Sequence, residues 1–132
     1  MSAAVGLAAL DLYEGGLLEN GRDVGRRLME GLRGLADHPL VGDVRGRGML
    51  AAIELVTDKE RKTPLPAAAA PARRVFDRAW ENRLVIRAFA DGMLGFAPPL
   101  CCTPAEIDAI VERTRLTLDQ TLADPDVRAA MR

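Results

Sequence analysis

The first segment of the chain is apolar on nearly every side. Residues 2–13 read SAAVGLAALDLY, and Asp11 is the one charged residue among them. The pattern predicts a helix, and a helix that is apolar all round has to be covered by protein all round. We therefore expect this helix to need a neighbour that a small domain does not itself provide.

A second helix is predicted after the break at Gly15-Gly16. Its apolar residues recur at spacings of seven, four, four and three, which places them on one helical face: Leu17, Val24, Leu28, Leu32 and Leu35. We expect this helix to end at Asp37-His38-Pro39, because the residue before a proline disfavours the helical region.

From residue 40 to residue 56 the pattern changes to that of a strand. The segment LVGDVRGRGMLAAIELV holds three glycines and then a run of branched aliphatics. This predicts an irregular lead-in followed by a strand over about residues 49–56. Glu54 is the one charge in that strand, and we expect it at a sheet edge or facing solvent. Residues 57–66 are charged and contain prolines, which predicts a surface loop.

A third helix and a hairpin are predicted next. The helix follows Pro71, and its expected inner stripe is Ala72, Val75, Phe76, Ala79 and Trp80. Residues 84–89 read as a short strand, residues 90–92 as a turn, and residues 93–97 as a returning strand, which together predict a β-hairpin.

The last helix carries the clearest start signal in the chain. Thr103 is an expected N-cap, Pro104 occupies the first helical position, and Glu106 completes a capping box. Its expected buried stripe is Ile107, Ile110, Val111, Leu118 and Leu122. Asp124-Pro125 should end it. The order of elements predicts an α+β fold, with a small antiparallel or mixed sheet covered by helices.

Composition narrows the function classes. The 132 residues carry a net charge of −1, which argues against a nucleic-acid partner. No apolar run is long enough for a membrane span or resembles a signal peptide. Cys101 and Cys102 are adjacent, so they cannot close a stabilising loop, and we expect reduced thiols in a soluble, cytoplasmic protein.

Most of the candidate chemical motifs have simple structural interpretations. Residues 46–51 match the dinucleotide pattern G-x-G-x-x-A, but a strand follows where the phosphate site needs a helix, so a tight turn with close backbone packing is expected. His38 should face water or bond a terminal carbonyl, without a nucleophile beside it. Glu112 and Asp119 are expected on a solvated helix face. No catalytic or metal-binding residue is assigned.

Arg87 is the candidate binding residue. It lies in the middle of the predicted strand Leu84-Val85-Ile86-Arg87-Ala88-Phe89, just before a turn. Its planar guanidinium can hold a carboxylate through two parallel hydrogen bonds. A half-exposed arginine in a strand is also common without any such role.

Three stretches together resemble the C-terminal region of class III aminotransferases, the omega-amino-acid transaminase group. They are GLLENGRDVGRRLMEGL (16–32), HPLVGDVRGRGMLAAIELV (38–56) and NRLVIRAFADGMLGFAPPLCCTPAEID (82–108). The opening AAVGLAALDLYEGG is similar to the alanine-rich helix after the family's substrate-loop region. The likeness covers almost the whole chain, and the order and spacing of the stretches make it specific.

The resemblance implies a fold-type I enzyme that moves amino groups between an amine or amino acid and a keto acid. Such enzymes are homodimers that carry pyridoxal phosphate on a lysine of a large domain, while the small domain forms part of the active-site wall. By its place in V-I-R-A-x-x-D, Arg87 corresponds to the mobile arginine that pairs with the substrate carboxylate and swings aside for amines. The family often has glycine before the aspartate, whereas this chain has Ala90. The turn could therefore have a different shape, which would affect the movement of the arginine.

The resemblance also implies a division of the chain. Residues 1–36 would link to the large domain, which is absent from this sequence, and residues 37–132 would form the α+β small domain. Lys59 and Lys62 lie in a charged loop and are unsuited to carry the cofactor. We expect no pyridoxal phosphate binding and no amino transfer by this chain alone. Two alternatives are a stand-alone module that grips a small carboxylate with Arg87, and a non-catalytic remnant of a transaminase.

Overall fold

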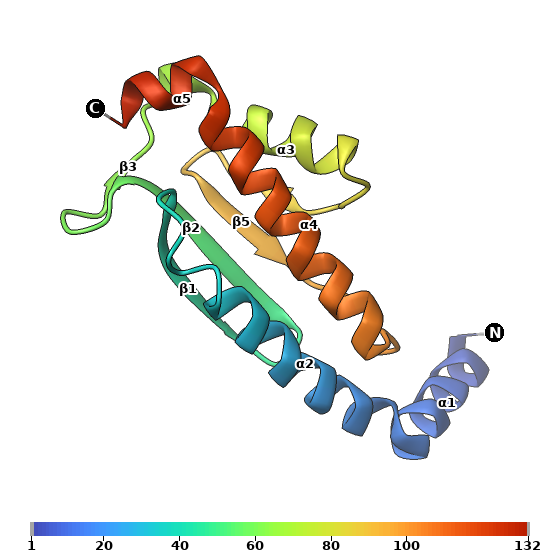
Figure 1. Cartoon of the computed structure of the whole chain (residues 1–132). Helices are drawn as coiled ribbons and strands as arrows, with labels where there is room; N and C mark the ends of the chain where they lie inside the picture. Colours follow the sequence, from blue (N-terminus) through green and yellow to red (C-terminus); the bar gives the residue numbers. More distant parts are fainter. Residues whose placement is uncertain (1, 132) are drawn as a thin grey trace.

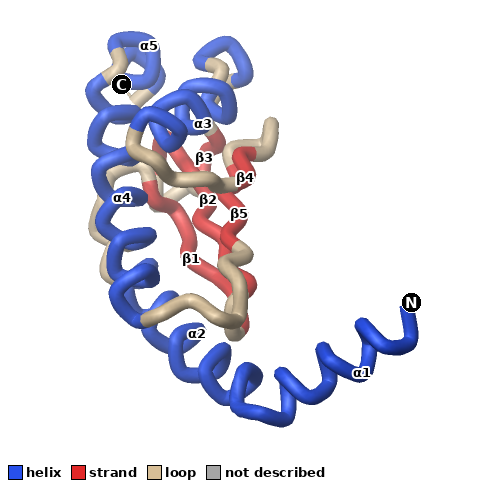
Figure 2. Tube along the Cα trace, turned by 90° about the vertical axis from the view of Figure 1, so that its right-hand side faces the viewer, coloured by secondary structure: helices blue, strands red, loops and turns tan. Residues whose placement is uncertain are grey.

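Helices cover one face of an antiparallel sheet, and the other face is open (Figures 1 and 2). The computed structural model describes residues 2–131. The helices are α1 (Ser2–Leu12), η1 (Tyr13–Leu17), α2 (Leu18–Arg33), η2 (Ala67–Ala69), α3 (Pro71–Glu81), α4 (Pro104–Ala123) and α5 (Pro125–Ala130). The strands are β1 (Val41–Arg47), β2 (Leu50–Asp58), β3 (Thr63–Pro64), β4 (Arg87–Ala88) and β5 (Met93–Phe96). The predicted α+β class is confirmed, and the described pairings are all antiparallel.

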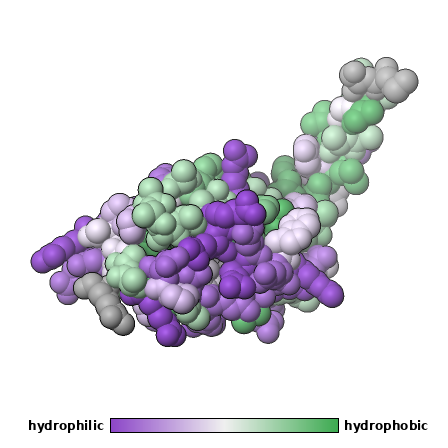
Figure 3. Space-filling view, turned by 90° about the horizontal axis from the view of Figure 1, so that it is seen from above, coloured by the Kyte–Doolittle hydropathy of each residue, from purple (hydrophilic) through white to green (hydrophobic). Residues whose placement is uncertain are grey.

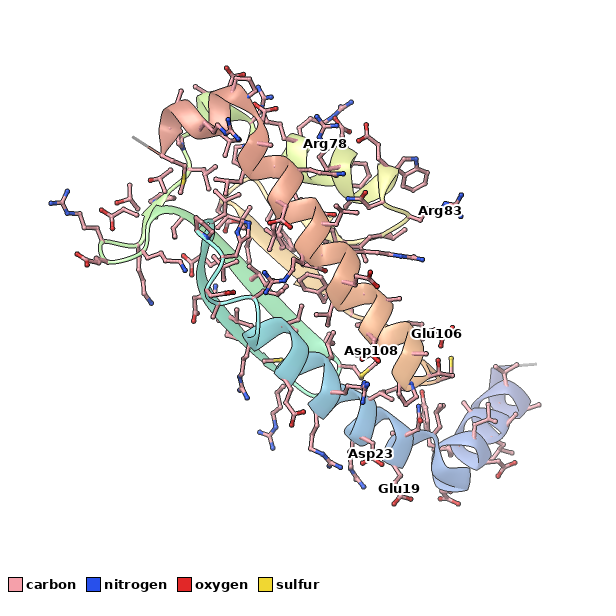
Figure 4. All side chains as sticks on the ribbon, in the orientation of Figure 1. Glu19, Asp23, Arg78, Arg83, Glu106 and Asp108 are labelled. Carbon is pink, nitrogen blue, oxygen red and sulfur yellow. The ribbon has the colours of Figure 1, made fainter. Side chains whose placement is uncertain are left out.

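The sheet runs in the order β1-β2-β5-β4, with the short β3 pairing with β2. Helices α2 and α4 lie side by side on one face (Figure 1), and α3 lies near the β4 edge (Figure 2). Asp108 of α4 points toward α2 in Figure 4, and its carboxylate accepts two hydrogen bonds from Arg27, at 2.6 and 2.7 Å. The core between the layers includes Leu28 of α2, Ile53 of β2 and Leu118 of α4, each fully buried.

The first two predicted helices form one bent arm. The break expected at Gly15-Gly16 is a kink within η1, where Gly16 adopts a φ of 109° that other residues rarely adopt. Beyond the kink, α2 ends at Arg33, four residues before Asp37, because the chain tightens into successive turns there. Helix α1 extends away from the body of the molecule (Figure 2).

The irregular lead-in expected before residue 49 is wrong, because residues 41–47 form β1 and pair with β2. The register runs from Val41 opposite Leu55 to Arg47 opposite Leu50, with an irregularity between Val41 and Asp43. An outer strand can carry glycines and charges because one of its faces is open to water. Those residues hid its strand character in the sequence.

Helix α3 differs from its predicted stripe. Val75 and Ala79 are buried, but Phe76 is 45% exposed and Trp80 is 66% exposed. Their rings stack on each other, with centroids 6.4 Å apart. The apolar spacing located the helix correctly and overestimated the width of its buried face.

Helix α4 begins as predicted. Thr103 accepts a hydrogen bond from the Glu106 amide at 3.3 Å, and Glu106 accepts one from the Thr103 amide at 2.7 Å. Of the expected stripe, Ile107 and Leu118 are fully buried, whereas Ile110, Val111 and Leu122 are only partly buried. Three threonines are buried in the same helix: Thr114, Thr117 and Thr121.

Within residues 2–131, no helix combines the length and the apolar character that crossing a membrane requires.

Candidate functional site

Arg87 lies on β4, the last strand of the main sheet. Strand β4 pairs only with β5, with Arg87 opposite Gly95 and Ala88 opposite Leu94. Around Arg87 the exposed and covered residues alternate, because successive side chains of an extended chain point to opposite faces. Val85, Arg87 and Phe89 are exposed, whereas Leu84 and Ile86 are buried. Arg87 therefore belongs to the open face of the sheet.

The turn after Arg87 accommodates Ala90. The Phe89 amide donates to the Met93 carbonyl at 2.8 Å, and the Gly92 amide donates to the Phe89 carbonyl at 3.0 Å. Gly92 takes the positive φ of this turn, 86°, and Ala90 keeps a negative φ. The glycine that the turn needs is therefore the one after Asp91, and the alanine before it introduces no backbone strain.

A row of four residues crosses the open face from β1 to β4. Arg45 pairs with Ala52, Ala52 with Gly95, and Gly95 with Arg87. Directly opposed residues in antiparallel strands point to the same face, so the two arginines flank two small residues. At a strand spacing of about 4.8 Å, the outer backbones of this row lie about 14 Å apart.

The two arginines of the row differ in their partners. Arg45 donates to Asp43 and to Glu54, at 2.8 Å in each case, and this contact lowers the pKa of Asp43. Glu54 thus lies on the open face of an inner strand, so the solvent-facing alternative is confirmed and the edge alternative is wrong. The Arg87 guanidinium makes no hydrogen bond or ion pair with any described residue, so its N–H groups remain free to bind an anion.

A shallow hollow of about 380 Å³ lies beside Arg87. Its walls combine the guanidinium-bearing strand with small and apolar residues: Phe76, Val85, Ile86, Arg87, Ala88, Gly95 and Ala97. Phe89 was not predicted to belong to this site, but its ring lies under the Arg87 guanidinium with 5.2 Å between Cζ and the ring centroid. The two-residue spacing of Arg87 and Phe89, which puts both on one strand face, is the signal that would have found it.

The glycine motif at residues 46–51 is a hairpin turn. It joins β1 to β2, and no helix N-terminus follows it. A Cβ on Gly25 of α2 would lie 2.8 Å from the backbone carbon of Gly48. The expected tight turn with close backbone packing is confirmed.

His38 lies in the protein core, contrary to the prediction that it faces water or bonds a terminal carbonyl. Its side chain is 3% exposed, and its Nδ1 accepts the Leu40 amide at 3.2 Å. Its Nε2 lies 3.3 Å from a carboxylate oxygen of Asp119, without a well-directed hydrogen bond. The ring is therefore a core group between the end of α2 and α4, while Glu112 lies on the solvated face of α4 as expected.

Neither lysine of the described residues is placed to carry pyridoxal phosphate. Lys59 donates to the Ala36 carbonyl at 2.7 Å, and Lys62 is exposed in the turn between β2 and β3. Neither amine is desolvated, as a cofactor-bearing lysine has to be. Between residues 2 and 131 there is also no group of three metal-ligating side chains.

Known proteins match the chain over most of its length. The profile of the family described as Aminotransferase class-III matches residues 1–118. The diaminobutyrate–2-oxoglutarate transaminase of Halomonas elongata is 39% identical over 123 residues, which is 91% of this chain and 26% of that protein. The taurine–pyruvate aminotransferase of Bilophila wadsworthia is 41% identical over 116 residues, 82% of this chain and 25% of that protein.

Solved structures agree in fold. A transaminase solved with L-alanine has a TM-score of 0.85 at 39% identity, covering 92% of this chain and 28% of that one. The omega transaminase of Pseudomonas jessenii in complex with PMP has a TM-score of 0.78 at 38% identity, covering 85% of this chain and 24% of that one. This chain spans about a quarter of the length of these relatives. With the family profile extending over residues 1–118 and the fold shared with solved transaminases, the chain belongs to the class-III aminotransferase family.

Proposed function

We propose that this chain is the C-terminal small-domain portion of a pyridoxal-phosphate-dependent transaminase. The intact enzyme would move an amino group between an amine or amino acid and a keto acid. The relatives are named for reactions of this type, with diaminobutyrate or taurine as one substrate and 2-oxoglutarate or pyruvate as the other.

One observation carries this proposal: α1 and the open sheet face are both uncovered and lie on the same side of the molecule (Figure 2). The large apolar residues of α1 are between 53% and 67% exposed: Val5, Leu7, Leu10 and Leu12. Figure 3 shows this hydrophobic surface on the arm that extends from a largely hydrophilic body. An apolar surface of this kind marks an interface, and we assign it to the large domain of the same enzyme.

We propose a division of the chain that is compatible with this contact. Residues 1–36 would connect the large domain to the α+β small domain of residues 37–132. Val24 and Leu32 of α2 are buried in the small-domain core. We therefore propose that α1 makes the contact with the large domain and that α2 anchors it.

We assign Arg87 to the substrate carboxylate. Its guanidinium faces the side on which the large domain would lie and has no carboxylate partner among the described residues, whereas Arg45 is neutralised by Asp43 and Glu54. A bidentate arginine–carboxylate pair is strong and directional. The open sheet face would then form one wall of the active site, and Arg87 would move aside when an amine without a carboxylate enters.

The cofactor belongs to the proposed large domain. Pyridoxal phosphate acts as the electron sink of amino transfer, and the omega transaminase named above was solved with PMP. This chain contributes orientation of the substrate through Arg87 and exclusion of water by the sheet face. We predict no amino transfer by the 132 residues alone; the homodimer and the cytoplasmic location also stay predictions.

The test is a chimaera of the Halomonas elongata enzyme in which residues 1–132 of this chain replace the matching quarter. We expect a protein that binds the cofactor and transfers an amino group from diaminobutyrate to 2-oxoglutarate. The matched control carries Leu7→Asp and Leu10→Asp, which should abolish domain docking and activity. A chimaera that folds and binds cofactor but transfers no amino group would contradict the proposal and favour the stand-alone module or the remnant.

A further inference from the structure

The Arg87 guanidinium lies over an aromatic ring two residues further along the chain. Arg87 and Phe89 are two residues apart in an extended segment, so their side chains share the open face. The distance from the Arg87 Cζ to the Phe89 ring centroid is 5.2 Å, which is within the range of a cation–π contact. No other described side chain holds this guanidinium.

Gly95 provides the space for that ring. A Cβ built on Gly95 would lie 3.2 Å from Phe89 Cε2 and 3.8 Å from Arg87 Cβ. Gly95 is also the cross-strand partner of Arg87. A side chain at this position would therefore press on the ring and shift it by a few tenths of an ångström beneath the guanidinium.

The contact with the ring uses no hydrogen-bond acceptor of the described residues, so the guanidinium N–H groups remain available. Arginine donates hydrogen bonds in the plane of the group, and stacking on an aromatic ring uses the perpendicular direction. An arginine held against a ring thus keeps its N–H groups available for two parallel hydrogen bonds, while its side chain loses much of its rotational freedom. Restricting a binding group in a competent orientation strengthens binding because less entropy is lost when the ligand arrives.

We infer that Phe89 is a positioning residue that preorganises Arg87 for a carboxylate, and that Gly95 leaves the space in which the Phe89 ring lies. This inference rests on the proposed role of Arg87 as the substrate-carboxylate arginine. It adds that the affinity of the site for acids, relative to neutral compounds of the same shape, depends on an aromatic side chain at position 89.

The experiment measures binding of propanoate to the 132-residue protein by NMR, following the arginine Nε–H resonances, with propanamide as the uncharged control ligand. The Arg87 resonance is assigned by its loss in Arg87→Gln. Phe89→Leu should weaken propanoate binding about twofold to fivefold, the value of an exposed cation–π contact, and should remove the ring-current shift of the Arg87 Nε–H. Phe89→Trp should restore both, Gly95→Ala should change the Arg87 Nε–H shift by a smaller amount than Phe89→Leu, and unchanged melting temperatures exclude a general loss of structure.

Two contrary results are distinguishable. If propanoate binding depends on Arg87 but Phe89→Leu leaves it unchanged or tighter, the positioning role is wrong and the proposed arginine role stands. If Arg87→Gln does not reduce propanoate binding, the carboxylate role of Arg87 fails and the positioning role fails with it. A Phe89→Leu effect of equal size in the Arg87→Gln background would also overturn the inference, since Phe89 would then act through some other group.

Discussion

At the scale of single residues, His38 links stability to pH. Burial lowers the pKa of His38, and the Asp119 carboxylate opposes that effect in part, while Arg115 and Lys59 reinforce it. The unfolded chain takes up a proton near the ordinary histidine pKa of about 6.5, but the folded chain does so only at lower pH. The unfolding free energy contributed by His38 is therefore fully present above about pH 6.5 and falls as the pH drops through that value.

We predict that this dependence disappears in His38→Asn, whose side-chain oxygen can still accept the Leu40 amide. Urea unfolding of both proteins between about pH 7.5 and pH 5.5 checks it, because the carboxylates with lowered pKa, such as Asp43 and Asp108, lose their contribution only at more acidic pH. A wild-type protein whose unfolding free energy is constant over this window would contradict the assignment.

Sequence reasoning could single out Arg87 as a candidate binding residue, because an arginine within an apolar strand is conspicuous, and its place on the open sheet face is compatible with that prediction. It did not predict correctly which of His38, Phe76 and Trp80 are buried and which are exposed. Whether a ring at a given helical position is covered depends on how far the neighbouring element extends, and the strand beside α3 is only two residues long. Local spacing carries no such information.

At the scale of elements, the β1–β2 hairpin approaches α2 at a glycine. We predict that Gly25→Ala lowers the unfolding free energy by about 1–3 kcal/mol, because its Cβ would press on the Gly48 backbone, which cannot turn aside as a side chain can. Chemical denaturation measures the loss. Gly6→Ala in α1 is the matched control, since nothing lies within 4 Å of its added Cβ; equal effects of the two substitutions would contradict the packing argument.

The capping box of α4 provides a second prediction at this scale. Thr103→Ala removes the hydroxyl that accepts the Glu106 amide and should cost about 1 kcal/mol of unfolding free energy. Thr103→Ser keeps the hydroxyl and should retain most of the stability. If serine and alanine are equally damaging in thermal unfolding, the cap hydrogen bond is not the cause.

The elements with local signals were predictable, and those defined by long-range pairing were less so. The cap of α4 and the glycine turn of the β4–β5 hairpin are encoded within a few residues. Strand β1 is not, because Gly42, Asp43 and Arg45 resemble a loop until β2 pairs with them. The length of β4 likewise depends on how much of β5 is available to pair.

At the scale of the whole molecule, α1 adds exposed apolar surface but little to the unfolding free energy. Deleting residues 2–12 should change the unfolding free energy by no more than about 0.5 kcal/mol, because the apolar side chains of α1 are exposed. The same deletion should reduce concentration-dependent self-association in sedimentation velocity experiments. A loss of several kcal/mol would instead mean that α1 packs within the domain.

The all-round apolar pattern of residues 2–13 was sufficient to predict a helix that needs a neighbour, and its exposure agrees with that prediction. The side of the molecule on which α1 lies was not predictable. That side depends on the direction of the kink at Gly16 and on which sheet face α2 and α4 cover. Neither can be predicted from the residues nearby in the sequence.

We propose that Arg87, on the open sheet face, binds the substrate carboxylate of a transaminase. The most direct test is Arg87→Gln in the chimaera, with the half-reactions of 2-oxoglutarate and of a simple alkylamine measured separately. Loss of a charge-assisted pair predicts a KM for 2-oxoglutarate that rises roughly 10- to 100-fold, with little change for the alkylamine. Equal changes for both substrates, or none for the keto acid, would contradict the account.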